Sequence, residues 1–133
     1  MQKGLSSYVF LFFLSIYLFT AQGHLGYEKD GWLRFLLAKN IIEKGILYFD
    51  DQTVIQECKG WMLKGRDNRD YVYYEIGHSL LFIPFYIAGK IVSQFFPVSE
   101  RMEIIKLICT FLNPLLAALL CLVFFQLMKQ LGY

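Results

Sequence analysis

Three long apolar runs dominate this chain of 133 residues and limit what it can fold into. They cover residues 8–21, 79–98 and 107–128. A domain of this size buries only about two-thirds of the surface of its unfolded chain, so one soluble core cannot hide all three runs. A lipid bilayer, with a hydrocarbon core about 30 Å thick, is a solvent that suits segments of this length.

Charge separates the middle of the chain from its ends. Residues 22–78 hold 8 of the 13 basic and 9 of the 11 acidic side chains, whereas hydrophobic residues make up 56% of the whole sequence. The net charge of +2 provides no global field for a polyanion, which excludes nucleic acid as a partner. The pattern predicts a polar loop between membrane-embedded segments.

The fold class that follows is an all-α membrane protein with three transmembrane helices. These spans are predicted at 1–21, as a signal-anchor, at 79–98, with a break at Pro84 and Gly89, and at 107–128. The basic start of the chain stays cytoplasmic, which makes 22–78 an extracytoplasmic loop and 99–106 a short cytoplasmic connector. Lys90 lies inside the second span and is expected to snorkel or to face protein.

The first apolar run also allows another interpretation. The small residues of Ala21-Gln22-Gly23 follow a short apolar core, as in a cleaved signal peptide, and cleavage there would release a secreted protein. The cysteines do not decide between the two. Cys58, Cys109 and Cys121 are odd in number and unevenly spaced, and no disulfide framework or metal-binding pair can be written for them.

Within the loop, residues 30–45 carry the best helix pattern. Asp30 can cap the start, apolar side chains recur on one face, and Gly45 stands at the end. Such an amphipathic helix can lie along the membrane interface or pack on its own loop, and the pattern leaves both open. Farther along, 60–70 has the composition of a loop, and 71–74 consists of strand formers.

The candidate chemistry lies just after the first span. Glu28 and Asp30 are two carboxylates at the outer lip of the bilayer, where one can accept a proton and the other can orient a group or hold a cation. The structural alternative is that Asp30 only caps a helix and Glu28 only complements its dipole. His24 and His78 flank the loop, which leaves a divalent metal as an open addition.

Two stretches carry a resemblance. The segments EKDGWLRF (28–35) and AKNIIEKG (38–45) look like the first extracytoplasmic loop of GT-C glycosyltransferases, and RDYVYYEIGHSLLFIPFY (69–86) resembles the stretch that follows it in that family. The family includes dolichyl-phosphate-mannose protein mannosyltransferases and undecaprenyl-phosphate-aminoarabinose lipid A transferases. The resemblance covers most of residues 8–131.

The resemblance implies an activity and roles for particular residues. Members transfer a sugar from a polyprenyl-phosphate donor to an acceptor on the extracytoplasmic side, in bacteria at the inner (plasma) membrane. Asp30 then corresponds to the general base that deprotonates the acceptor hydroxyl, with Glu28 as a second acid. The residues implied in substrate binding are Arg34, Arg69, Tyr74 and His78.

The chain departs from the family in length and in its motifs: Arg34 lies one residue later than the family's arginine, and residues 69–73 lack the glycine and lysine of the family's turn. Asp30 is followed by Gly31 rather than by a second acid, and GT-C enzymes have many more membrane helices than three. We therefore expect the amino-terminal part of an enzyme that is inactive alone and needs further transmembrane helices as partners. The rival hypothesis is a small non-catalytic membrane protein that binds partner helices through Lys90, Asn113 and Gln126.

Overall fold

The computed structural model describes residues 2–21, 25, 29–73 and 76–132 and is mostly helical. Its element order along the chain is α1 (Gln2–Thr20), α2 (Lys29–Lys44), α3 (Gln52–Glu57), the 3-10 turn η1 (Lys59–Trp61), β1 (Met62–Lys64), β2 (Asp70–Val72), α4 (Gly77–Ser93), α5 (Arg101–Thr110) and α6 (Leu112–Gln130). The two strands form one small hairpin, which the all-α prediction omitted.

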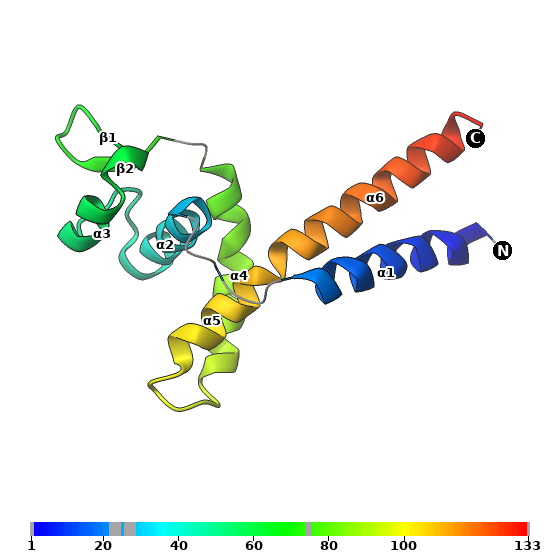
Figure 1. The fold of residues 1–133 in the computed structure, drawn as a ribbon, viewed down its shortest axis with the longest axis horizontal. Helices are drawn as coiled ribbons and strands as arrows, with labels where there is room; N and C mark the ends of the chain where they lie inside the picture. Colours follow the sequence, from blue (N-terminus) through cyan, green and yellow to red (C-terminus); the bar gives the residue numbers. More distant parts are fainter. Residues whose placement is uncertain (1, 22–24, 26–28, 74–75, 133) are drawn as a thin grey trace. The chain divides into compact units, whose positions relative to one another are not determined.

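The elements form two compact units. Helices α1 and α6 make up one, which we call the helix pair, and residues 25–109 make up the other, which we call the central unit. Within the helix pair the two chain termini lie at the same end, so α1 and α6 run in opposite directions (Figure 1). The hydroxyl of Tyr17 lies 3.6 Å from the Sγ atom of Cys121 where the two helices pack.

Large apolar side chains cover the outside of the helix pair. The most exposed of them are Tyr8, Phe12, Phe19, Leu120, Val123, Phe124 and Leu131. Two hydroxyls of α1 bond within their own helix: Ser15 donates to the carbonyl oxygen of Leu11 at 2.7 Å, and Thr20 donates to that of Ile16 at 3.0 Å. A hydroxyl satisfied in this way needs no water, so this surface is compatible with lipid.

One helical stretch of the described residues, Arg101–Gln130, is long and apolar enough to cross a membrane, with a mean hydropathy of 2.4 over its best window. A turn at Phe111 divides it into α5 and α6. Pro114 lies in the first turn of α6, where a missing N–H is tolerated. The apolar part of α1, Gly4–Thr20, is shorter.

The central unit is built on α2, one residue displaced from the helix predicted at 30–45. Leu33 and Leu37 point into a core with Phe49, Cys58 and Met62. On another side of α2, Phe35 is fully buried against the ring of Tyr86, at 5.7 Å between centroids. Protein therefore surrounds the apolar residues of α2, and the prediction that this helix lies on the membrane interface is wrong. Packing on its own loop, the other alternative, is what the structure has.

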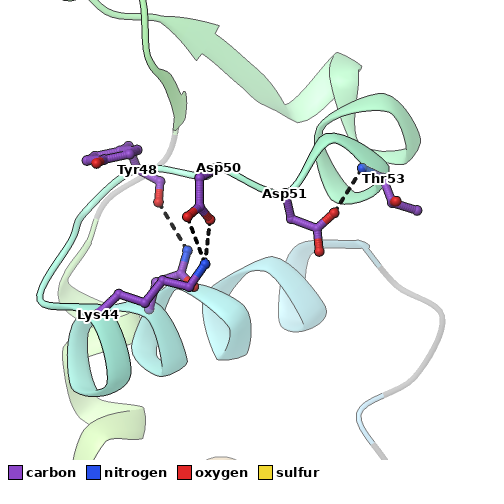
Figure 2. A network of polar contacts seen from close by, with 6 residues as sticks. Lys44, Tyr48, Asp50, Asp51 and Thr53 are labelled. Atoms are coloured by element: carbon purple, nitrogen blue, oxygen red, sulfur yellow. Dashed lines mark hydrogen bonds and ion pairs between the residues drawn. The ribbon is translucent and has the colours of Figure 1, made fainter.

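Polar contacts fix the chain after α2 (Figure 2). Lys44, in the last turn of α2, donates to both carboxylate oxygens of Asp50, at 2.6 and 2.8 Å. The side chain of Asp51 then accepts a hydrogen bond from the backbone of Thr53 at 2.9 Å and caps α3. These contacts hold the turn that leads back to the hairpin, where Met62 pairs with Val72 in antiparallel register.

Helix α4 is continuous through Pro84 and Gly89, so the predicted break at these residues is wrong. A proline inside a helix removes one hydrogen bond, and α4 continues past that loss. Gly89 has a packing role instead, because a Cβ atom added to it would lie 2.9 Å from the Cα atom of Ile105. The glycine thus allows α4 and α5 to approach closely.

Helix α5 begins inside the predicted connector 99–106. This segment is helical from Arg101 onward, and the Nζ atom of Lys106 lies 5.0 Å from the centre of the Trp32 ring in α2. Lys90, in the predicted second span, lies 3.3 Å from Glu43 of α2. Both α4 and α5 therefore contact α2 within the central unit.

Candidate functional site

A carboxylate, a guanidinium and an imidazole meet where α2 and α4 begin. Asp30 lies in the first turn of α2, and its Oδ1 atom is 3.1 Å from the Nε atom of Arg34, one turn later. The Nη1 atom of Arg34 is 3.0 Å from the Nδ1 atom of His78, in the first turn of α4. We call these three residues the Asp30 cluster.

Two aromatic stacks lie in the parts of α2 and α4 that carry the Asp30 cluster. His78 stacks on Phe82 at 5.4 Å between centroids, and Trp32 stacks on Phe35 at 5.6 Å. Lys106 of α5 lies over the Trp32 ring and forms an ion pair with Glu103 at 2.6 Å, so it belongs to the Trp32 side of α2. The side chain of Asp30 is 40% exposed and that of Arg34 25%, so the cluster is held by packing yet open to solvent.

The arrangement combines a proton acceptor with positive charge. An ionised carboxylate can take a proton from a hydroxyl group within hydrogen-bonding distance. A guanidinium such as that of Arg34 binds phosphate oxygens through charge-assisted hydrogen bonds. A substrate with a hydroxyl and a phosphate group meets both requirements here.

Of the six predicted site residues, the structure brings together Asp30, Arg34 and His78. Arg69 lies elsewhere in the central unit: its Nε atom is 3.6 Å from Asp67, and its guanidinium lies 4.2 Å from the centre of the Tyr48 ring. Glu28 and Tyr74 lie outside the described residues, as does His24 of the metal hypothesis. In the part of the chain that the structure describes, no group of three or more acidic, histidine or cysteine side chains could hold a metal ion.

No pattern in the sequence indicates that Lys106 contacts α2. A basic residue between two apolar runs is typical of a cytoplasmic loop, so the sequence predicts a connector there. The contact of Lys106 with Trp32 joins residues 74 positions apart, which no local pattern reveals. The Asp30–Arg34 spacing of one helical turn, in contrast, is readable from the sequence.

A second polar contact joins the other ends of α2 and α4. The hydroxyl of Tyr86 donates to the Oε1 atom of Glu43 at 2.7 Å, and the Nζ atom of Lys90 donates to the same oxygen at 3.3 Å. Burial raises the pKa of Glu43, but the hydrogen bonds from Tyr86 and Lys90 outweigh burial and hold the pKa below its ordinary value. Lys90 thus contacts another helix of this chain, which is one of the two alternatives that the sequence left open for it.

This contact predicts a pH-dependent contribution to stability. Because the pKa of Glu43 is lower in the folded chain than in the unfolded one, its carboxylate stabilises the fold above about pH 4.3 and loses that effect as the pH falls through the folded pKa. Glu43→Gln should therefore cost about 1.5 kcal/mol at neutral pH, the low end for hydrogen bonds to a charged group. Thermal unfolding of both forms in detergent checks this, and the two curves should converge in acid. Glu100→Gln, at an exposed position, is the control; a gap between Glu43→Gln and wild type that persists in acid would contradict the assignment.

No family model, no curated protein and no solved structure matches this chain. The function of the Asp30 cluster is therefore argued from its own chemistry and from the residues that carry the resemblance.

Proposed function

We propose that this chain is the acid-bearing segment of a GT-C type membrane glycosyltransferase and that Asp30 is its general base. The observation that carries the proposal is the Asp30 cluster: an acid at the start of α2, held by Arg34 and by the helix that carries His78, and open to solvent. The segments that resemble the family contribute this acid and this histidine. Further membrane helices act with the chain as partners.

In this proposal α1 and α6 cross the bilayer as an antiparallel pair. The apolar part of α1 has 17 residues, the lower limit for a spanning helix, and α6 has 19. Their exposed apolar surface supports the assignment, since a soluble monomer rarely shows an apolar patch of more than a few hundred Å². The proposal has two crossings where the sequence predicted three.

Charge supports an orientation for the pair. Lys3 lies near the start of α1 and Lys129 near the end of α6, and an antiparallel pair carries both at one end. Basic residues favour the cytoplasmic side, so both termini are cytoplasmic and residues 25–109 lie outside. A three-span topology places Lys129 on the outer side, against this tendency. The two-span topology places Lys129 on the cytoplasmic side, in agreement with it.

The reaction is a displacement at the anomeric carbon of the sugar. The acceptor oxygen forms the new bond to that carbon, the bond from the carbon to the phosphate oxygen breaks, and polyprenyl phosphate leaves. Asp30 takes the proton of the acceptor hydroxyl, while Arg34 stabilises the leaving phosphate. A carboxylate in the segment next to a membrane helix suits a donor whose phosphate sits at headgroup depth.

Sugar transfer in membranes tests the proposal. Membranes are prepared from cells that lack the gene and from the same cells complemented with the full chain. Each is supplied with undecaprenyl phosphate carrying radiolabelled mannose or aminoarabinose. Complementation should restore transfer, and Asp30→Asn should lower it about a hundredfold or more, the range for loss of a general base.

The matched control is Asp50→Asn, which also removes one carboxylate from an ion pair, that with Lys44. It should leave transfer unchanged. Equal transfer by wild type and Asp30→Asn would remove Asp30 from the mechanism. Equal transfer with and without the gene, for both donors, would favour the non-catalytic membrane protein.

A further inference from the structure

Helix α4 has two faces of opposite character. Its buried side chains recur every three or four residues, at Ser79, Phe82, Tyr86, Gly89 and Ser93. The opposite arc is exposed and carries no charge; its members are Leu80, Leu81, Pro84, Ile87, Ala88, Ile91, Val92 and Phe95. This arc, which we call the outer face of α4, continues past the helix into Val98.

The outer face is too apolar for an ordinary water-facing surface. Phe95 is 85% exposed and Val98 77% exposed, and the charged residue of the helix, Lys90, turns aside to Glu43. A surface helix in water carries polar residues opposite its buried face, and this one carries leucine, isoleucine and phenylalanine. An apolar environment therefore suits the outer face of α4 better than water.

That environment does not surround the helix, because the buried face packs on protein. Tyr86 donates to Glu43 of α2, and Gly89 meets Ile105 of α5. A helix that crosses a bilayer alongside α2 would draw the polar end of α2 into hydrocarbon, at a cost of several kcal/mol per charge. A helix that lies in the interface meets lipid on one side and protein on the other, as α4 requires.

We propose that the outer face of α4 lies in the phospholipid interface of the membrane that the helix pair crosses, with its axis along the bilayer surface. The chain keeps it near that surface. Only eight residues separate Thr20 from Lys29, a reach of roughly 30 Å, and α5 is followed after one residue by α6. This inference rests on the membrane crossing in the proposed function and is independent of sugar transfer.

The docking has a consequence for the Asp30 cluster. His78 lies in the first turn of α4 and contacts Arg34, so the helix that rests on lipid also holds one side of the cluster. Seated in the interface, α4 keeps the cluster within reach of a phosphate at headgroup depth. The sequence pointed to α2 for this interfacial position, and the exposed apolar arc assigns it to α4.

Fluorescence quenching by brominated lipid measures the depth of this face. The full chain is reconstituted into phosphatidylcholine–phosphatidylglycerol nanodiscs whose acyl chains carry bromine either near the headgroup or near the chain end. Leu80→Trp, Ile87→Trp and Phe95→Trp sample the outer face, and the signal of native Trp32 and Trp61 is subtracted. Each added tryptophan should lose most of its fluorescence to the shallow bromine and little to the deep one.

The control is Gln52→Trp, at an exposed position of α3, which should lose no fluorescence to either lipid. Stronger quenching of Ile87→Trp by the deep bromine would mean that α4 crosses the bilayer, and it would overturn the inference. Absence of quenching at all three positions would mean that water or a partner protein covers the face, and it would overturn the inference as well. Neither result depends on sugar transfer, so it can fail while the proposed activity stands.

Discussion

A cysteine placed at Glu100, between α4 and α5, should react with a membrane-impermeant maleimide added outside intact cells. A cysteine at Lys129 should react only after the membrane is opened. The reason is the proposed two-span topology: α1 and α6 run in opposite directions (Figure 1), and if both cross the bilayer, the residues between them lie on one side of it. The effect is all-or-none, because a bilayer core about 30 Å thick separates the two sides.

Gln52→Cys is the control, since both topologies place α3 outside. The native cysteines add little background, because Cys58 and Cys109 are buried and Cys121 lies in α6. Three spans would give the reverse pattern, with Lys129→Cys labelled from outside and Glu100→Cys protected. That pattern would overturn the two-span proposal and would leave Asp30 on the outer side.

Hydropathy and periodicity predict helix α2 but not the packing of α4. Caps and an apolar stripe suffice to find α2, because the signals lie within one helix. The run at 79–98 is as long as a span, but length does not separate a helix that is apolar all round from one with a face buried on protein and an exposed apolar face. Ser79, Gly89 and Ser93 mark the protein face, and only the packing on α2 and α5 shows it.

The candidate site is likewise predictable from the sequence only in part. Asp30 and Arg34 are one helical turn apart, so their ion pair follows from the sequence alone. His78 reaches Arg34 from α4, and this contact depends on how α2 and α4 pack. A pattern within one segment can therefore predict the ion pair of the site but not the residue that joins it from another helix.

Replacing Gly89 by leucine should open the contact between α4 and α5. The first added carbon would lie 2.9 Å from the Cα atom of Ile105 and 3.2 Å from its Cγ2 atom, and a backbone atom cannot rotate away as the end of a side chain can. Overpacking of this kind costs about 1–3 kcal/mol. Hydrogen exchange of the full chain in nanodiscs measures the loss: the amides of α5 should exchange about tenfold faster for each 1.4 kcal/mol.

Ala88→Leu is the matched control, one residue away on the outer face of the same helix. It adds a side chain of the same final size where nothing packs within the central unit, so exchange in α5 should stay at the wild-type rate. Because α5 also carries Lys106, opening this contact should loosen the Lys106 ammonium from the Trp32 ring, while Ala88→Leu leaves that contact unchanged. Wild-type exchange in Gly89→Leu would show that α4 and α5 do not pack through this glycine.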